Sequence, residues 1–288
     1  MSKAPSPYKT PGDFRRALED RLKVLSEKEK TPLDRLRRRV AFDRMLARLF
    51  SDEKPRWLLK GGYALEFRLR NTARTTKDID FSIAEMRDSN SDKILDFLRV
   101  EARREIGDWF EFLVEVPTME LEQAVYGGWR YPVECRLDNR TFSKFHLDVG
   151  IGDAVVSTPE WRKGQDFFGF AGISPPNVAL LPLDQHFAEK IHAYSLPRGE
   201  RPNSRTRDLV DIVLLMDYGL PNKKLVQKAL QATFKRRNTH SLPVKLTPPP
   251  AAWETSYRKL AEECGVSKKN VTEAFALLEK FWSGMDFQ

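Results

Sequence analysis

The residues with the clearest chemical potential are aspartates in two short alternating stretches. The first reads KDIDFSI, and the alternation of side chains along a strand places Asp78, Asp80 and Ser82 on one face and apolar residues on the other. The second reads FHLDV, in which Asp148 points away from the apolar residues. If the two strands are neighbours, the three carboxylates converge and would suit two divalent cations that clamp a phosphoryl-transfer reaction. Taken singly, each acid also fits an ordinary solvated strand face.

A pair of glycines lies about one helix and one turn before the first acidic stretch. Gly61 and Gly62 follow the apolar run WLLK and precede YALEF, so we expect them between a strand and the start of a helix. Glycines at such a place let backbone N–H groups approach an anion, and the helix N-terminus adds partial positive charge. An ordinary turn is the alternative, and the spacing from Asp78 favours phosphate binding.

A further acid lies in an apolar helical stretch of the C-terminal half. Asp211 has apolar neighbours nearly all round the predicted helix, so we expect its carboxylate to be partly buried and to need a cationic partner. Arg207, one turn earlier, and Lys190 are the candidate partners. The alternatives are a surface ion pair between Arg207 and Asp211 and a lysine whose stem covers apolar surface.

The elements that position these residues divide the chain into three predicted segments. Residues 1–11, rich in Pro, Ser and Lys, are expected to form a flexible arm. Residues 12–175 begin with two basic helices and continue as short apolar runs broken by glycine, which predicts an α+β domain. The Pro-rich stretch ISPPN ends this domain, and the helical periodicity of residues 176–288 predicts a helical domain.

Basic side chains gather in three places. The second predicted helix has apolar residues at helical spacing, and arginines on the rest of its surface predict a cationic flank. These arginines are Arg35, Arg37, Arg38, Arg39, Arg44 and Arg48. Two further clusters lie within residues 198–207 and 235–237. Such residues could neutralise an RNA backbone, and a solvated face is the alternative.

Composition excludes several classes of protein. The 288 residues include 49 Lys+Arg against 41 Asp+Glu, a net charge of +8, and are 41% hydrophobic, which excludes wholesale disorder and favours polyanionic partners. Two distant cysteines and four histidines without a CxxC or HxxxH pattern argue against a disulfide framework or a structural zinc site, so any metal should be held by oxygen. Since no secretory signal or bilayer-spanning apolar stretch is present, we expect a cytoplasmic protein with no membrane partner.

The segment that joins the glycines to the acids carries a family resemblance. It reads GGYALEFRLRNTARTTKDIDFSI and resembles the Gly-Gly/Ser and Asp-hydrophobic-Asp motifs of the polymerase-β-type nucleotidyltransferase superfamily. The residues GGYAL and DID within it are similar to those of the AbiEii/MenT family of toxin nucleotidyltransferases. The resemblance implies an α+β, polymerase-β-like nucleotidyltransferase domain with a mixed sheet, followed by a helical C-terminal domain.

The same resemblance implies roles for the residues of this segment. Asp78, Asp80 and Asp148 would bind metal, and Gly61 and Gly62 would hold the nucleotide triphosphate. Gly62 stands where superfamily members commonly have serine. The missing hydroxyl contact to phosphate is therefore expected from Thr75, Thr76 or Ser82.

The helical half extends the resemblance. The stretches DQHFAEKIHAY and RTRDLVDIVLL are similar to the later Lys and Arg-Asp-x-x-Asp elements of the family. On this resemblance Lys190 contacts nucleotide phosphates, Arg207 lies beside the nucleotide, and Asp211 completes the site.

The resemblance as a whole implies an NTP-dependent enzyme that uses Mg²⁺, with Mn²⁺ as a substitute. The implied acceptor is the 3′ end of tRNA or another RNA, and the implied role is that of a toxin with a co-encoded antitoxin protein. Two alternatives remain open: nucleotidyl transfer to a small hydroxylated molecule such as an aminoglycoside, and a non-catalytic regulator that binds nucleotide or RNA.

Overall fold

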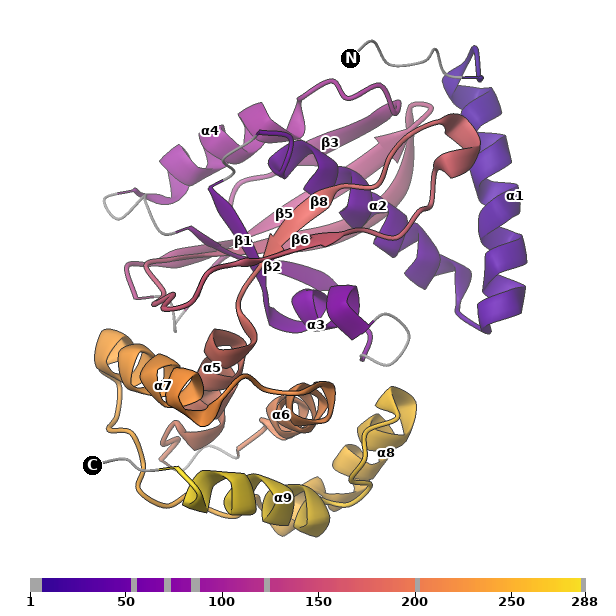
Figure 1. The fold of residues 1–288 in the computed structure, drawn as a ribbon. Coiled ribbons are helices and arrows are strands. Elements are labelled where there is room, and N and C mark those ends of the chain that lie inside the picture. The colour runs from indigo at the N-terminus through magenta and orange to yellow at the C-terminus, as the bar shows by residue number, and fades with distance from the viewer. Residues whose placement is uncertain are drawn as a thin grey trace.

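The computed structural model describes residues 7–52, 56–69, 74–83, 89–121, 125–199 and 203–285. A twisted sheet with helices on its faces forms one part of the molecule, and a bundle of helices lies next to α3 and forms the other (Figure 1). The predicted architecture, an α+β part with a mixed sheet followed by a helical part, is confirmed. Residues 1–6 of the predicted arm lie outside the described residues.

The described residues form an eight-stranded sheet in the order β3-β5-β6-β2-β1-β8-β7, with β4 paired to β5. Its strands are β1 (Trp57–Lys60), β2 (Asp78–Ile83), β3 (Phe110–Val114), β4 (Met119–Glu120), β5 (Gly128–Leu137), β6 (Arg140–Ile151), β7 (Glu160–Lys163) and β8 (Asn177–Leu180). The sheet is mixed because β2 runs parallel to β6 and β1 parallel to β8, whereas the other paired strands are antiparallel. Strand β8 lies beyond residue 175, so the sheet extends past the predicted end of the first domain.

The helices fall into two groups along the chain. The first group comprises α1 (Pro11–Glu29), α2 (Leu33–Leu49), α3 (Gly61–Leu69) and α4 (Ser91–Ala102). The second comprises α5 (Leu183–Ser195), α6 (Thr206–Tyr218), α7 (Lys223–Arg237), α8 (Glu254–Cys264) and α9 (Val271–Ser283). Among the described residues, no helix combines the length and the apolar character that a membrane crossing requires.

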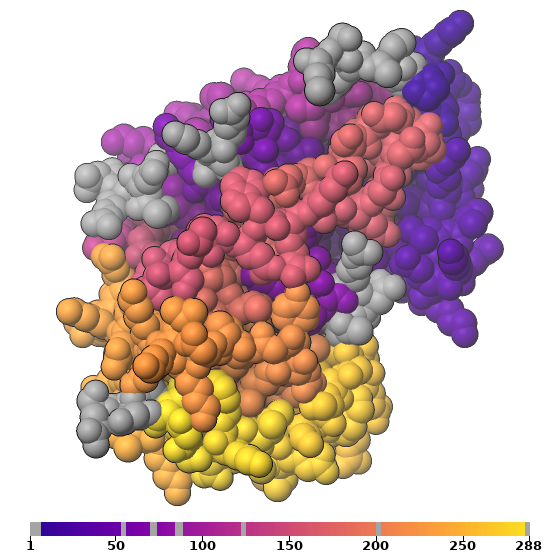
Figure 2. All heavy atoms as spheres, viewed as in Figure 1, coloured from indigo at the N-terminus to yellow at the C-terminus, as the bar shows by residue number. Residues whose placement is uncertain are grey.

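The second group of helices packs around a core of its own. Ile212, Val213 and Leu215 of α6 are completely buried in it. Leu65 of α3 joins the same core, so α3 connects the sheet part to the helical part. In Figure 2 the orange and yellow atoms of the helical part form one lobe, with the indigo-to-rose atoms of the sheet part beside it.

The register of β2 against β6 decides where the acidic residues lie. Ile79 and Phe81 of β2 are completely buried, so the intervening aspartates lie on the opposite face, as alternation predicts. In the parallel pairing, Asp80 lies beside Asp148 and Asp78 beside His146. The two predicted strands are therefore neighbours, which was the condition for the carboxylates to converge.

The cationic flank predicted for α2 is wrong for most of its arginines. Arg44 and Arg48 are buried, where Arg44 pairs with Asp43 and Arg48 donates to both carboxylate oxygens of Asp108 at 2.9 and 2.8 Å. Three other arginines form ion pairs: Arg35 with Glu66, Arg37 with Glu19 and Arg39 with Glu29. A buried guanidinium requires such a partner, and helical periodicity does not show that distant acids supply it. Arg38 is the one member of the group without an ion pair to any described residue.

Candidate active site

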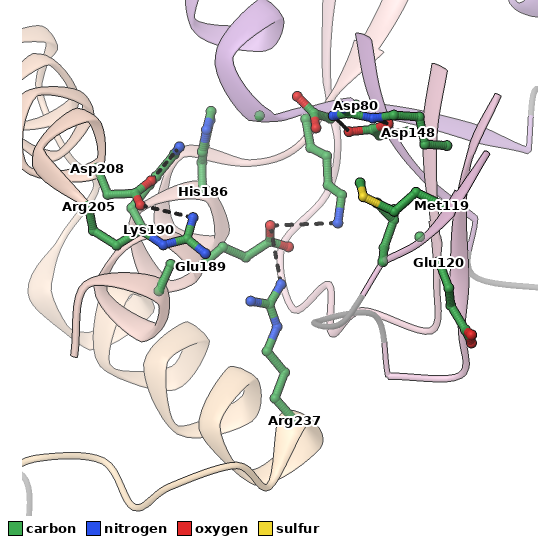
Figure 3. Close-up of a pocket in the computed structure, with 16 residues that line it drawn as sticks. Asp80, Met119, Glu120, Asp148, His186, Glu189, Lys190, Arg205, Asp208 and Arg237 are labelled. Carbon is green, nitrogen blue, oxygen red and sulfur yellow. Dashed lines mark hydrogen bonds and ion pairs between the residues drawn. The ribbon is translucent and has the colours of Figure 1, made fainter. Parts of the chain in front are cut away.

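A cleft between the sheet part and the helical part brings several predicted site residues together. Its volume is about 600 Å³, and its walls come from β1, β2, β4, β5 and β6, from the start of α3 and from helices α5 to α7. Asp80 and Asp148 lie side by side on one wall, while Lys190 and Asp208 lie on the opposite wall (Figure 3). Glu189 and Arg237 lie between these walls.

Asp80 lacks a hydrogen-bond partner among the described residues. Burial and the neighbouring Asp148 together raise the pKa of its carboxyl to about 7, against the opposing effect of Lys60, Lys190 and Arg74. A carboxylate in this position gains from a bound cation, because a cation offsets both the loss of hydration and the repulsion from Asp148.

Arg130 of β5 holds the other two aspartates of the set. Its Nε and Nη2 atoms donate to the two oxygens of Asp148 at 2.7 and 2.6 Å, and Nη2 also donates to Asp78 at 3.3 Å. Asp78 is further bonded to Nδ1 of His146 at 3.0 Å. Sequence reasoning missed Arg130, because its role follows from the register that places it directly opposite Asp148 on β6.

Gly61 must be a glycine because of its closeness to Asp80. Its φ is +63°, and a Cβ atom there would lie 2.0 Å from Oδ2 of Asp80. The chain leaves β1 and enters α3 at this residue, so the start of the helix lies against the acid. At Gly62, a Cβ would lie 3.0 Å from the guanidinium of Arg74. The predicted arrangement of strand, glycine pair and helix is therefore present.

Lys190 of α5 and Asp211 of α6 lie in one buried network. Lys190 Nζ is 2.9 Å from Asp208 and 2.7 Å from Asp211, and Arg74 donates twice to Asp211 at 2.9 Å. Burial raises the pKa of Asp211, but Lys190 and Arg74 outweigh burial and hold that pKa below its usual range. The prediction of a buried acid paired with Lys190 is thus confirmed by the ion pairs.

The prediction that Arg207 pairs with Asp211 is wrong. Arg207 is exposed, whereas Asp211 is completely buried and takes Arg74 as its arginine partner. Spacing of one helical turn places two residues on neighbouring positions, but here the arginine turns to solvent because Arg74 from the segment before β2 already fills the partner position. No signal within the local helix pattern identifies Arg74.

A second ion-pair network crosses the cleft and was also missed. Lys60 pairs with Asp153 and lies 3.8 Å from Glu189, and Arg237 lies 3.0 Å from Asp153 and 3.5 Å from Glu189. Burial raises the pKa of Asp153, but Lys60 and Arg237 outweigh it and lower that pKa to about 2. Two basic residues therefore remain charged beside the cleft, next to the glycine pair that follows Lys60.

The predicted hydroxyl contacts are not brought to the cleft. Ser82 is buried on β2, and the Thr76 hydroxyl donates to the backbone carbonyl of Asp78 at 3.1 Å. Thr75, Thr76 and Ser82 are all absent from the residues that line the described cleft. Arg74, from the same segment as the threonines, is the group that lies against Gly62.

The other predicted basic clusters are only partly available to a polyanion. Arg205 lines the cleft 3.4 Å from Asp208, and residues 200–202 lie outside the described part of the chain. Lys235 is exposed, Arg236 donates to the Tyr126 hydroxyl at 3.0 Å, and Arg237 belongs to the buried network described above.

Asp80, Asp148 and the adjoining Asp78 are called the acidic wall below. The oxygen donors of this wall fit a hard divalent cation. Asp80 presents a carboxylate without a hydrogen bond from any described residue, next to that of Asp148, and oxygen donors of this kind suit Mg²⁺. Within the described residues, no three His, Cys, Asp or Glu side chains are already gathered as a metal-binding group. Arg130 explains this, because it holds Asp148 and Asp78 with its own positive charge.

Comparison with known structures identifies the fold. The nucleotidyltransferase toxin MenT4 from Mycobacterium tuberculosis superposes with a TM-score of 0.54 at 19% identity, over 96% of this chain and 99% of that chain. The antibiotic-resistance factor ANT(2″)-Ia matches with a TM-score of 0.37 at 14% identity, over 69% of this chain and 91% of that chain. No curated protein matches the sequence significantly.

A family model gives the assignment. The model described as nucleotidyl transferase AbiEii toxin, type IV toxin-antitoxin system, matches residues 44–278. That range includes the glycine pair, the acidic strands and the Lys190–Asp211 network. The chain therefore belongs to the AbiEii family of nucleotidyl transferase toxins of type IV toxin-antitoxin systems.

Proposed function

We propose that this protein transfers nucleotides from an NTP to the 3′ end of tRNA in a Mg²⁺-dependent reaction, and that it thereby acts as a toxin held in check by a partner antitoxin. The observation that carries the proposal is the placement of Asp80 beside Asp148, directly against the Gly61 turn that begins α3. Family membership supports the transferase class, and the acceptor and the metal are the parts proposed here.

The triphosphate lies, in this proposal, between the acidic wall and the opposite wall of the cleft. The N-terminus of α3 at Gly61 and Gly62 offers backbone N–H groups to the phosphates. Lys190, which lines the cleft, offers a cation to the leaving end of the nucleotide. Lys60 and Arg237 line the same cleft, where Asp153 and Glu189 hold them in place through ion pairs.

Asp80 and Asp148, with Asp78 as the third ligand, would hold Mg²⁺, which when bound would neutralise the phosphates and stabilise charge in phosphoryl transfer. Arg130 would then give up its bonds to Asp148. The Lys190 network keeps its cation in place, because Asp208 and Asp211 are themselves held in the helical part.

The reaction forms one bond and breaks one bond. The 3′ oxygen of the acceptor loses its proton to solvent and forms a bond to the α-phosphorus of the NTP. The bond from that phosphorus to the β-phosphate oxygen breaks, and pyrophosphate leaves with the electron pair. Catalysis consists of positioning and charge neutralisation, as in other phosphoryl transfers.

The test is incubation of the purified protein with Mg²⁺, total cellular RNA and each α-labelled NTP in turn, followed by a denaturing gel. We expect label in the tRNA band for at least one nucleotide, and none with the Asp80→Asn protein as control. Label confined to a small hydroxylated molecule would overturn the tRNA assignment, and tight NTP binding without any labelling would replace catalysis with regulation by binding.

A further inference from the structure

A second cavity of about 550 Å³ adjoins the cleft at Arg130, and Lys190 is not among the residues that line it. Asp78 and Arg130 line it, and Arg130 also lines the cleft described above, so the two spaces meet at the acidic residues. We infer that this cavity takes the single-stranded 3′ end of the acceptor RNA, with its phosphodiesters against Arg38, Lys77 and Lys144. This inference rests on the proposed function and specifies where its acceptor binds.

The geometry of phosphoryl transfer requires two spaces of this kind. The attacking oxygen and the leaving oxygen lie in line, on opposite sides of the transferred phosphorus. If pyrophosphate leaves on the side of Gly61 and Lys190, the acceptor hydroxyl must arrive from the other side of Asp80 and Asp148. Asp78, two residues before Asp80 on β2, opens onto the second cavity.

Three of the cations that line this cavity form no ion pair with a described residue, unlike most arginines of the neighbouring surface. Arg38 lies on α2, Lys77 immediately before β2 and Lys144 on β6. None forms an ion pair with a described residue, although Lys144 lies opposite Glu134 in the β5–β6 pairing. Lys77 and Lys144 are exposed, and Arg38 is half-buried. By contrast, the neighbouring Arg35 and Arg37 on α2 are neutralised by Glu66 and Glu19. Cations from three separate segments of the chain are suited to following a phosphate backbone.

The rest of the lining is compatible with a nucleic acid strand. Pro132, which is half-buried, contributes apolar surface against which a base can pack. Besides Asp78, the acids Glu115 and Glu134 line the cavity. Arg136 and Thr141 bind Glu134 and lower its pKa to about 2, so part of its charge is already compensated. Glu115 is exposed. Asp78 is a third acid of the lining and pairs with Arg130, so the four Lys and Arg side chains of the lining outnumber its acids by one.

The test compares two triple variants that remove the same charge. The first is Arg38→Ala/Lys77→Ala/Lys144→Ala. The matched control is Lys28→Ala/Lys228→Ala/Lys259→Ala, at exposed lysines that line neither cavity. Kinetics with tRNA and NTP, and equilibrium binding of tRNA to each protein as a function of salt, are measured side by side.

We expect the cavity variant to raise the KM for tRNA by about ten-fold or more and to leave the KM for NTP at the wild-type value. Its log-log salt slope for tRNA binding should fall by about two, since each phosphate contact to a single strand contributes about 0.7. The control should match the wild type in both measurements.

Equal tRNA affinity in the cavity variant and the wild type, or an equal loss in the control, would overturn the assignment of this cavity. The binding measurement separates this failure from a failure of the proposed function. If the wild type labels no RNA yet binds tRNA through these three residues, the transfer reaction is wrong and the RNA site stands. If it labels tRNA with no loss in the cavity variant, the reaction stands and the site is wrong.

Discussion

Arg130 is the residue that compensates most of the negative charge of the acidic wall. Its guanidinium donates hydrogen bonds to Asp148 and Asp78 at donor–acceptor distances of 2.6 to 3.3 Å, whereas Asp80 receives no hydrogen bond from a described residue. A divalent cation bound to the same carboxylates would compete with Arg130 for them. The free energy of metal binding should therefore include the cost of displacing this arginine.

The substitution Arg130→Gln should increase the stabilisation that Mg²⁺ gives to the folded protein. Without the guanidinium, Asp148 and Asp78 repel each other and Asp80 until a cation binds. In thermal unfolding with EDTA, the variant should melt below the wild type, and its rise in Tm on adding Mg²⁺ should be larger than that of the wild type. An identical rise in both proteins would mean that the metal does not use the carboxylates that Arg130 holds.

A pH-dependent stability is expected from Asp80. Its pKa in the folded protein is about 7, against an ordinary value of about 3.9 for an unfolded chain. The folded state therefore binds the extra proton, and the stability present below pH 4 is lost as the pH rises towards and through 7. The asparagine of the Asp80→Asn protein carries no charge at any of these pH values. In metal-free buffer, the Tm of this variant minus the Tm of the wild type should therefore increase from pH 5 to pH 8. A constant difference across this range would contradict the raised pKa.

The residues of the acidic wall were predictable to different degrees. Alternation within KDIDFSI was enough to place Asp78 and Asp80 on one face, because one strand has only two faces. Arg130 and Arg74 were not predictable, because each pairs with an acid more than a few residues away in sequence. Their roles depend on strand register and on how the two parts of the molecule pack, which a single sequence does not display.

At the scale of elements, the turn from β1 into α3 is the tightest feature of the site. Gly61 has a positive φ, and any side chain there would meet Asp80 at 2.0 Å. Gly62 is less constrained, because its φ is not positive and the nearest atoms to a new Cβ belong to the Arg74 guanidinium at 3.0 Å rather than to an acid of the site. The two neighbouring glycines therefore allow a matched comparison.

Gly61→Ala should reduce transfer by at least about a hundred-fold, because the strained turn would push Asp80 away from its position. Gly62→Ser should retain most of the activity, since Arg74 can shift by a few tenths of an ångström. Steady-state kinetics with circular dichroism as a folding control measure both effects. Full activity in a folded Gly61→Ala protein would show that the closeness of this turn to Asp80 has no part in the reaction.

The pairing of α5 with α6 through Lys190 has consequences for both stability and nucleotide use. Removing Lys190 leaves Asp208 and Asp211 without their shared cation, although Arg74 still binds Asp211. Breaking a buried pair by removing one partner costs about 3 to 5 kcal/mol. The Lys190→Ala protein should therefore unfold at a lower urea concentration than the wild type. Its KM for NTP should rise by a larger factor than its Kd for RNA.

Lys190→Arg should rescue this variant only partly, because a planar guanidinium does not replace a compact ammonium between two carboxylates. NTP titrations and urea unfolding of the three proteins provide the measurement. If Lys190→Ala bound and used NTP as the wild type does, Lys190 would be a structural residue of the helical part alone.

The helices and strands themselves were largely foreseen where their periodicity is strong. The apolar pattern of α6 and the alternation of β2 and β6 gave the right element types. The error at α2 has a clear cause: Arg44 and Arg48 look like surface residues in a helical pattern, but they extend into the interior to reach Asp43 and Asp108. The end of the sheet was set five residues too early, because the short strand β8 follows immediately after Pro175 and Pro176.

At the scale of the whole molecule, the site is shared between its two parts. Lys60 and Asp153 come from the sheet part, whereas Glu189 and Arg237 come from α5 and α7, and these four residues form ion pairs across the boundary. Arg74 and Asp211 form a second link. Two parts were predicted from the change in sequence pattern, but the cleft between them depends on their packing and could not be located in advance.

The net charge of +8 indicated only that a partner should be negatively charged, not where it binds. Many of the arginines that contribute to it are neutralised inside the protein, as those of α2 are. The structure instead places a smaller set of cations near the acidic residues, at Arg38, Lys77 and Lys144, which form no ion pair with a described residue. Position relative to the acids, rather than total charge, carries the argument for an RNA acceptor.

Nucleotide transfer to the 3′ end of tRNA changes the intact mass of a defined tRNA, and this mass can be measured. The tRNA is incubated with the protein, Mg²⁺ and each NTP separately, alongside tRNA whose 3′ end has been oxidised by periodate. We expect that at least one NTP increases the mass by one or a few nucleotide residues, that pyrophosphate is released, and that the oxidised tRNA keeps its mass. An unchanged mass of the intact tRNA with every NTP, from protein that binds NTP, would contradict the account.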